Sequence, residues 1–315
     1  MDSWNQTKFD QFILTGLTND QVLRVFLFVV FLIIYIFSFM SNFGMILLIK
    51  MHHNLQTPMY FFLGNLSFVD MCYSSTITPK MLSGFLMEQN SISFVECVMQ
   101  MSLFAMFATS ECFLVTAMAY DRYVAICRPL FYHKLMDSAT CWWMVTGAYL
   151  SSLLASVSHT VTIFNFPLCG TNKINHFYCD IPPLLKLTCV NSSLRKTVVF
   201  SLSLVMGIIS FFVILMSYVS IISSILDIKS TEGRSKAFST CGSHLTVVIL
   251  FYGSVFCIYF RPSIGLDLES IDKFFSIFYT VASPLLNPLI YSFKNVEVKR
   301  AMINAYVQKR KVSSE

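Results

Sequence analysis

Long runs of apolar residues, separated by short polar segments, dominate the pattern along the chain. The clearest run covers residues 25–49 and carries no charge. A helix needs roughly 20 mostly apolar residues to cross about 30 Å of hydrocarbon. Six further runs are long enough, and we expect additional membrane spans at about 59–82, 95–120, 138–161, 197–226, 237–260 and 273–292.

These spans are expected to be α-helices, because backbone in lipid must satisfy its own hydrogen bonds. A membrane β-barrel would instead show alternating segments of about ten residues, which these runs do not. The pattern therefore predicts an all-α membrane protein, a seven-transmembrane helix bundle. We expect residues 1–24 to form an extracellular N-terminal segment and residues 25–292 the bundle. Residues 293–315 would form a short amphipathic eighth helix and a cytoplasmic tail.

Composition agrees with a membrane protein. Hydrophobic residues make up 55% of the chain and charged residues only 12%, whereas soluble domains carry about 25% charged residues. Mean hydropathy is +0.64. This balance argues against a cytosolic enzyme, a disordered chain and a nucleic-acid-binding domain, and it makes membrane lipid the expected surroundings.

The distribution of Lys and Arg predicts the orientation, since these residues gather in cytoplasmic loops. With the N-terminus outside, the inner segments hold 13 of the 22 basic residues and carry an excess of positive charge. The net charge of +5 is therefore explained by topology, with no nucleic-acid partner required. The polar first 20 residues do not resemble a cleavable signal peptide, so we expect the first span to direct insertion.

Three polar side chains are expected at similar depth inside the membrane. At 1.5 Å per residue, Glu111 lies about 21 Å from Cys97, and Asn287 lies about 21 Å from Lys273. Asp70 lies about 18 Å from Pro58, counted from the opposite membrane surface. Charges at this depth are costly and mark a functional site by default.

Two interpretations of Asp70 and Glu111 stay open. They could belong to a hydrogen-bonded polar core in which one carboxyl holds a shared proton. The sharper hypothesis is that they bind a cation, Na⁺, that biases a conformational switch. No other cofactor is expected.

Four of the ten cysteines fall on the predicted outer side: Cys97, Cys169, Cys179 and Cys189. An oxidising compartment and an even count predict two disulfides, and three connectivities are possible. The bridges would pin the long loop at about 162–196 as a lid over the bundle. Asn5 begins a glycosylation sequon on the same side, and Asn191 begins a second candidate close to the membrane.

Motifs of catalysis are missing from the sequence. It contains no GxSxG, P-loop, HExxH or GxGxxG pattern, and its six histidines are scattered. An enzyme is therefore not expected. A transporter is disfavoured because no inverted repeat is evident.

Several motifs together resemble one family. Asp121-Arg122-Tyr123 at the end of the third span, with Asn287-Pro288-Leu289-Ile290-Tyr291 in the seventh, resemble the rhodopsin-like G-protein-coupled receptors. More specific strings are LQTPMY at 55–60, PKML at 79–82, MAYDRYVAIC at 118–127, KAFSTCGSHL at 236–245 and FYG at 251–253. In this order they resemble a vertebrate olfactory (odorant) receptor of the tetrapod-type class. Two departures are Ser41, where glycine is usual, and Arg128, where histidine is commoner.

The resemblance implies a Cys97–Cys179 bridge from the third helix to the outer loop and a Cys169–Cys189 bridge within that loop. It implies a pocket in the outer half of the bundle, lined by Phe104, Ala105, Ala108, Thr109, Leu202, Met206, Val255, Tyr259, Ile277 and Thr280. The expected residues for switching and G-protein coupling are Asp121, Arg122, Tyr123, Tyr218, Tyr252, Asn287, Pro288 and Tyr291.

The function that the resemblance implies is detection of a small, largely apolar volatile odorant. A heterotrimeric stimulatory olfactory G protein would then raise cyclic AMP, with the receptor in the plasma membrane of sensory-neuron cilia. The runner-up is non-olfactory chemosensing by the same scaffold, followed by a channel or transporter. A channel would give ligand-gated current without a G protein, and a transporter would give substrate flux.

Overall fold

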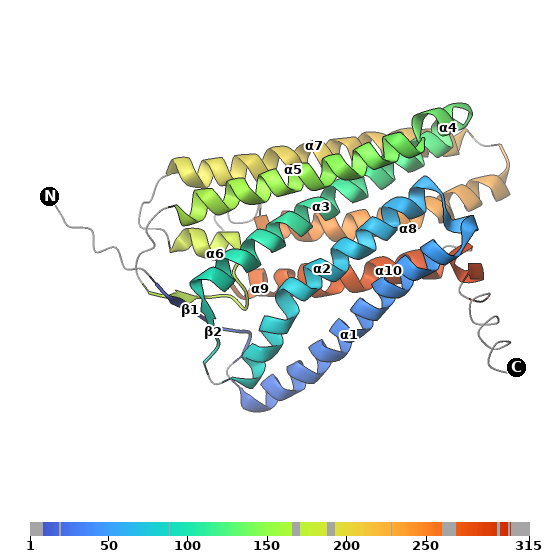
Figure 1. Ribbon diagram of the computed structural model, residues 1–315. Coiled ribbons are helices and arrows are strands. Elements are labelled where there is room, and N and C mark those ends of the chain that lie inside the picture. Colours follow the sequence, from blue (N-terminus) through green and yellow to red (C-terminus); the bar gives the residue numbers. More distant parts are fainter. Residues whose placement is uncertain are drawn as a thin grey trace, which may run out of the picture.

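The computed structural model describes residues 9–18, 20–87, 89–165, 171–187, 193–227, 229–259, 269–294, 297–301 and 303. Long helices lie side by side in a single bundle (Figure 1). A small sheet covers one end of this bundle, and the short helix α4 lies at the other. We call these the sheet end and the Arg122 end.

Six long helices account for the first six expected spans. They are α1 (Gln21–Met51), α2 (Pro58–Leu86), α3 (Phe94–Cys127), α5 (Ser138–Phe164), α7 (Ser193–Leu226) and α8 (Thr231–Tyr259). The seventh span combines α9 (Glu269–Ile277), the π-helical segment η4 (Phe278–Ala282) and α10 (Ser283–Lys294). Several helices are longer than the apolar run that predicted them, because hydropathy marks the part in lipid and helical hydrogen bonding continues beyond it.

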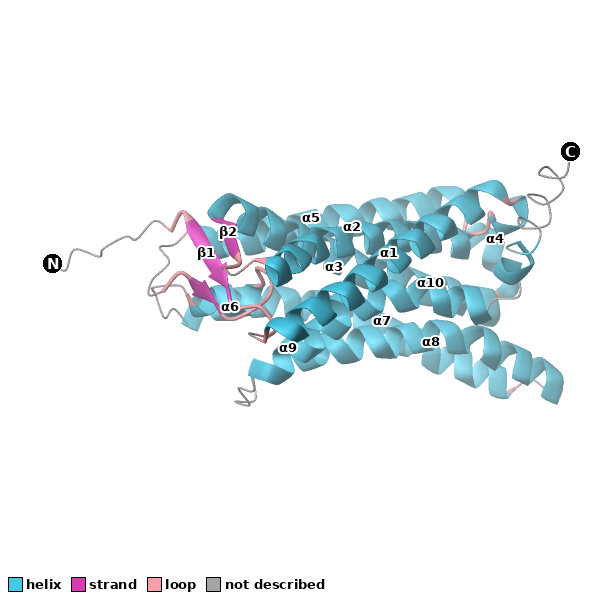
Figure 2. Ribbon diagram, turned by 90° about the horizontal axis from the view of Figure 1, so that it is seen from below, coloured by secondary structure: helices cyan, strands magenta, loops and turns pink. Residues whose placement is uncertain are grey.

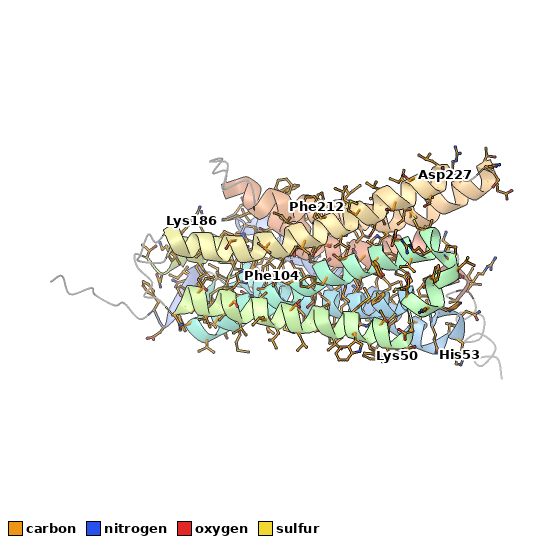
Figure 3. All side chains as sticks on the ribbon, turned by 90° about the horizontal axis from the view of Figure 1, so that it is seen from above. Lys50, His53, Phe104, Lys186, Phe212 and Asp227 are labelled. Atoms are coloured by element: carbon orange, nitrogen blue, oxygen red, sulfur yellow. A yellow bond between two sulfur atoms is a disulfide. The ribbon has the colours of Figure 1, made fainter. Side chains whose placement is uncertain are left out.

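Membrane-spanning character is strongest in four helical segments of the described chain. Gln21–Met51, Phe94–Cys127, Val205–Leu226 and Lys273–Tyr291 are both long and apolar enough to cross a membrane. Side chains fit this placement: Lys50, His53 and Asp227 lie at one end of the bundle and Lys186 at the other (Figure 3). Between the ends, Phe212 points outward from α7 and is 56% exposed, as expected of a lipid-facing residue.

Polar residues fix where several helices begin. The carboxylate of Asp20 accepts a hydrogen bond from the Leu23 N–H at 2.8 Å, at the start of α1. At the start of α3, the Ser93 hydroxyl accepts from the Glu96 N–H, and the Glu96 carboxylate accepts from the Ser93 N–H. This capping box satisfies two backbone donors that the first helical turn leaves without partners.

Helix α3 occupies the centre of the bundle. It packs against α2, α5 and α7, while α1 packs against α2 and α10, and α10 packs against α8. Large apolar side chains fill the spaces between these helices, and Leu66, Leu114 and Met118 are fully buried. The central position of α3 brings its side chains close to most of the other helices.

The sheet at the sheet end joins three segments that are far apart in sequence (Figure 2). Strand β1 (Gln11–Leu14) pairs antiparallel with β2 (Ser91–Ser93) and parallel with β3 (Lys173–Ile174). Phe12 and Leu14 of β1 are buried. The sequence prediction had given residues 1–24 no strand.

Short elements complete the described fold. They are η1 (His53–Leu55), η2 (Pro129–Phe131), α4 (Tyr132–Leu135) and α6 (Ile181–Lys186). Residues 297–301 are helical, with Val298 and Ala301 buried and Lys299 and Arg300 exposed. This is the amphipathic pattern expected for the eighth helix, most of whose remaining length lies outside the described residues.

A proline in the seventh span leaves one backbone carbonyl of α10 without its usual helical hydrogen bond. Pro288 has no N–H for the carbonyl of Pro284 four residues earlier. Asn42 of α1 supplies the missing donor, since its Nδ2 lies 2.8 Å from the Pro284 oxygen and 3.0 Å from that of Ser38. Asn42 is fully buried, so this bond ties α1 to α10 without competition from solvent.

We expect Asn42→Ala to lower the free energy of unfolding by about 1–3 kcal/mol, because it leaves a buried carbonyl without a donor. Thermal unfolding of the purified protein in detergent measures the change. Ser158→Ala is the control, since the Ser158 hydroxyl is exposed and donates within its own helix to the Leu154 carbonyl. Equal melting temperatures for the two variants would contradict the role of Asn42.

Candidate functional site

The three polar residues expected at similar depth meet in the middle of the bundle. Asn287 Nδ2 donates to Asp70 Oδ2 at 3.0 Å and to Glu111 Oε1 at 3.2 Å. Ser283 Oγ donates to the same Glu111 oxygen at 3.0 Å. All four side chains are buried, and together they form what we call the polar cluster.

The polar cluster holds more acceptors than donors. Within the described part of the chain, Asp70 Oδ1 and Glu111 Oε2 are buried and have no hydrogen-bond partner. Carboxylate oxygens are the ligands that hard cations prefer, and two neighbouring carboxylates also favour uptake of one proton. The described residues contain no group of three or more acidic, histidine or cysteine side chains arranged as a metal site.

A second group of predicted switch residues lies at the Arg122 end. Tyr132 of α4 donates to Asp121 Oδ1 at 2.9 Å. Tyr218 of α7 is hydrogen-bonded to His244 Nδ1 of α8, and their rings stack. Among the described residues, Arg122 Nε and the Tyr291 hydroxyl are buried and find no partner.

The remaining predicted switch residues lie between these two clusters or beside them. The Tyr252 hydroxyl lies 3.1 Å from Cys112 Sγ and so connects α8 with α3. Tyr123 contacts Tyr120 with ring centroids 6.1 Å apart. Pro288 is buried one residue after Asn287.

Several predicted pocket residues surround one aromatic group near the sheet end. The ring of Phe104 lies 5.4 Å from Tyr73, 5.2 Å from Tyr178 and 6.3 Å from Tyr279. Ala108 and Ile277 pack against this group. Ala105, the next residue of α3, packs in the apolar cluster that includes Cys97 and Cys179.

The hydroxyls among the predicted pocket residues bond to their own helices. Thr109 donates to the Ala105 carbonyl at 2.8 Å, and Thr280 donates to the Ser276 carbonyl at 2.7 Å. Met206 is half-buried on α7. The side chains of Leu202, Val255 and Tyr259 lie outside the described residues, as do Asn5, Asn191, Cys169 and Cys189.

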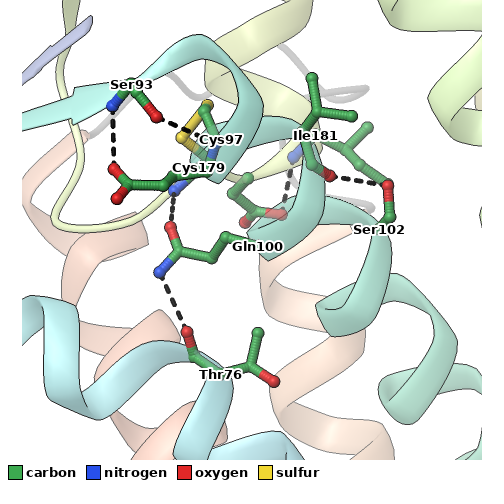
Figure 4. The surroundings of a disulfide bond; sticks show 10 residues. Thr76, Ser93, Cys97, Gln100, Ser102, Cys179 and Ile181 are labelled. Atoms are coloured by element: carbon green, nitrogen blue, oxygen red, sulfur yellow. Dashed lines mark hydrogen bonds between the residues drawn. A yellow bond between two sulfur atoms is a disulfide. The ribbon is translucent and has the colours of Figure 1, made fainter. Parts of the chain in front are cut away.

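The segment 171–187 forms a lid over the sheet end, fastened at several points (Figure 4). The disulfide Cys97–Cys179 joins it to α3, which confirms that predicted bridge. Lys273 Nζ donates to Asn175 Oδ1 at 2.9 Å and to the Gly16 carbonyl at 3.1 Å. One lysine of α9 therefore holds both the lid and the N-terminal segment.

Two titratable groups are buried in the lid. Burial raises the pKa of Asp180 to about 6, although hydrogen bonds from the Ile181 N–H and the Tyr178 hydroxyl oppose the shift. Burial, together with the nearby positive charge of Lys273, lowers the pKa of His176 to about 3. His176 Nε2 lies 3.3 Å from Ser276 Oγ, so a neutral imidazole fastens the lid to α9.

A separate cavity of about 60 Å³ lies between the N-terminal segment and the end of α2. Leu14, Arg24, Asn90 and Phe177 are among its walls, and none of the predicted pocket residues lines it. One water needs roughly 10–15 Å³. The cavity therefore has room for a few waters.

The whole bundle matches a known fold. A structural comparison finds squid rhodopsin, with a TM-score of 0.72 and 18% sequence identity over 96% of this chain and 84% of the rhodopsin chain. Together with the apolar helices, this likeness defines the class: the protein is a seven-helix membrane protein of the rhodopsin fold, as the sequence predicted.

Sequence comparisons identify the family within this class. The family model described as "Olfactory receptor" matches residues 31–309. The human protein "Olfactory receptor 8U9" is 49% identical over 98% of this chain and 100% of its own length. The mouse protein "Olfactory receptor 5G25" is 48% identical over 97% of this chain and 96% of its own. The chain belongs to the olfactory receptor family.

Membership of this family confirms the function at the level of class. The protein is an odorant receptor in a membrane, and its relatives are receptors and not enzymes. Odorant ligands and coupling to G proteins are general properties of the family.

Some residues of the site escaped sequence reasoning. Ser283, His244, Gln100, Tyr178 and Lys273 all make contacts in these clusters. His244 and Lys273 carried weak signals, as a histidine inside a span and a lysine at a span boundary. The others are ordinary polar or aromatic residues whose partners lie on other elements.

The pKa of His176 predicts how acid affects the lid. Between pH 6.5 and pH 3 the unfolded chain binds a proton that folded His176 does not. As the pH is lowered through this window, the free energy of unfolding should therefore fall by about 1.4 kcal/mol per pH unit. Above pH 6.5 neither state binds this proton, and His176 makes no pH-dependent contribution. Asp180 acts in the opposite direction near pH 6, so only a comparison of variants isolates the histidine.

Thermal unfolding of the purified receptor at pH 7.5 and pH 5 tests this expectation. Wild type should lose about 2 kcal/mol more than His176→Asn between these values. The control is His53→Asn, which removes an exposed histidine at the Arg122 end. If His176→Asn and wild type respond equally to acid, the neutral buried histidine is ruled out.

Proposed function

We propose that this odorant receptor binds a small, neutral, largely apolar ligand in the half of the bundle next to the lid. The observation that carries the proposal is the aromatic group around Phe104, which lies directly beneath Tyr178 of the lid. Small-molecule sites are mostly apolar, with a few polar groups. No acidic residue occurs on α3 between Cys97 and Glu111, so a salt bridge to an amine ligand is not expected there.

The proposed signal passes along α3. Phe104 and Glu111 are seven residues apart, which is about 10 Å along a helix, and Arg122 lies about 16 Å beyond Glu111. An agonist that binds the active arrangement more tightly shifts the population toward it. The switch residues at the Arg122 end, with Tyr252 and the Asn287-Pro288 segment, then change partners, and the bundle opens to a stimulatory olfactory G protein that raises cyclic AMP.

This function requires a defined orientation. We place the sheet end outside the cell and the Arg122 end inside, in the plasma membrane of sensory-neuron cilia. The charge distribution supports this placement, because most basic residues belong to segments of the Arg122 end. An extracellular sheet end also suits the Cys97–Cys179 bridge, a second bridge between Cys169 and Cys189, and glycosylation at Asn5.

We further infer that the polar cluster binds Na⁺. Asp70 Oδ1 and Glu111 Oε2 offer two unpartnered carboxylate oxygens, and a monovalent cation would offset one of their charges. Bound Na⁺ would favour one arrangement of α2, α3 and α10. A proton shared by the two carboxylates is the alternative. The response to agonist would then depend on pH, whereas bound Na⁺ would make it depend on the Na⁺ concentration.

A cyclic-AMP reporter screen tests the main proposal. Cells that supply the olfactory G protein and display the receptor should respond to members of a chemically diverse volatile panel. Arg122→Ala should abolish the response and leave surface display measurable. Lys50→Ala, which removes an exposed positive charge at the same end, should respond normally. A silent wild-type receptor, a normally signalling Arg122→Ala, or a current without G protein would each contradict the proposal.

The Na⁺ inference has its own test. Replacing external Na⁺ with a large organic cation should shift the agonist concentration for half-maximal response in wild type. Glu111→Gln should remove that dependence, because the substitution takes away one carboxylate of the pair. Potency that ignores Na⁺ in wild type, and is unchanged by Glu111→Gln, would leave the shared proton as the occupant.

A further inference from the structure

Gln100 makes an unusual double contact directly below the disulfide (Figure 4). It lies three residues after Cys97 on α3, and its side chain is only 6% exposed. Its Oε1 accepts a hydrogen bond from the backbone N–H of Cys179 at 3.0 Å. Its Nε2 donates to the Thr76 carbonyl of α2 at 3.1 Å. One amide therefore connects the lid, α3 and α2.

The chemistry of this contact is specific to an amide. The Cys179 N–H requires an acceptor and the Thr76 carbonyl can only accept, and among uncharged side chains of this length glutamine serves both at once. A carboxylate would accept only, and a thioether of the same shape offers at most a weak acceptor. Close by on α2, Pro79 has no N–H for the Ser75 carbonyl, so Gln100 contacts the helix where its own hydrogen bonding is interrupted.

The disulfide and Gln100 hold the same lid residue in different ways. The disulfide fixes the side chain of Cys179 to α3, with the two Cα atoms 5.5 Å apart. Gln100 fixes its backbone. Two attachments on one residue restrict both the height of the lid above α3 and its rotation about the bridge.

The neighbouring residue carries this placement to the proposed ligand site. Tyr178 is fully buried, and its ring meets Phe104 edge-on with centroids 5.2 Å apart. Its hydroxyl donates to Asp180 Oδ2 at 3.0 Å, and Asp180 Oδ1 accepts from the Ile181 N–H at 2.7 Å. The Tyr178 side chain is thus held by Asp180 at its hydroxyl and by Phe104 at its ring. Because Tyr178 directly precedes Cys179, a movement of the Cys179 backbone should move the Tyr178 ring relative to Phe104.

We propose that Gln100 is a positioning residue for ligand selectivity, which holds the lid so that Tyr178 forms the outer wall of the pocket over Phe104. This inference rests on the proposed function, since it assumes a ligand beside Phe104. Gln100 does not itself need to touch the ligand. Its effect on selectivity passes through Tyr178.

Hydrogen exchange tests the attachment without any ligand. In the purified full-length receptor, the Cys179 amide should exchange at least about tenfold faster in Gln100→Met than in wild type, because a buried hydrogen bond is lost. Gln100→Glu keeps the acceptor and should retain part of the protection. The control Gln56→Met makes the same change at an exposed position of the Arg122 end and should not alter exchange. Unchanged exchange in Gln100→Met overturns the proposal.

A double-mutant cycle tests selectivity. Two agonists of different size are compared through the ratio of their half-maximal concentrations, which is insensitive to the amount of receptor displayed. Gln100→Met and Tyr178→Leu should each change this ratio, by about tenfold for a lost buried contact. The double variant should change it no further than Tyr178→Leu alone, since Gln100 acts through Tyr178.

Each outcome of the cycle decides the proposal. Additive effects, or a ratio that stays unchanged in Gln100→Met while the Cys179 amide exchanges faster, overturn it. If Gln100→Met is not displayed at the cell surface, the ratio in Tyr178→Leu decides, and an unchanged ratio overturns the proposal. A wild-type receptor that responds to no odorant contradicts the proposed function, and the exchange result then still decides whether Gln100 positions the lid.

Discussion

The constraint on which this structure depends is that a polar group surrounded by lipid must find its partner inside the bundle. Asp70, Glu111 and Asn287 come from three helices, and each would be costly alone. They meet because α2, α3 and α10 are packed so that one amide reaches both carboxylates. The same rule explains Asn42, which supplies the donor that Pro288 denies to the Pro284 carbonyl. Polar contacts therefore fix how these helices are placed, while apolar contacts fill the space between them.

The residues that contact the other parts of the structure follow one another along helix α3. From the sheet end it carries Cys97, Gln100, Phe104, Glu111, Cys112 and Arg122. The first five of these residues contact, in turn, the lid, α2, the aromatic group, the polar cluster and Tyr252 of α8. Glu111 and Cys112 are consecutive, and the other neighbours in this series lie about one to three helical turns apart, so a small displacement at one level is felt by the packing of the next. A ligand beside Phe104 needs no contact with the Arg122 end to influence it.

The parts predicted from sequence are those that depend on composition and spacing. Seven apolar runs predicted the helices. A rise of about 1.5 Å per residue predicted that Asp70, Glu111 and Asn287 lie at a similar depth in the membrane. The sheet was not foreseen, because β1 has four residues and acquires its structure from β2 and β3, which lie about 80 and 160 residues away. Phe104 was expected to line the pocket, but its partner Tyr178 follows from how the lid folds back. Likewise, nothing in the sequence around Gln100 indicates that its amide spans two other elements.

Unpartnered polar atoms at the Arg122 end raise the free energy of the arrangement in this structure, and a second arrangement of the helices could pair some of them. Within the described residues, Arg122 Nε, His244 Nε2 and the Tyr291 hydroxyl are buried without partners. A buried group in this condition costs about 1–3 kcal/mol. An arrangement that pairs some of these groups would recover part of that cost, and states that interconvert differ by only a few kcal/mol. In the polar cluster, hydrogen bonds hold α2, α3 and α10 as they are, although Asp70 Oδ1 and Glu111 Oε2 are also buried without partners among the described residues. A ligand that binds the second arrangement more tightly would shift the population toward it.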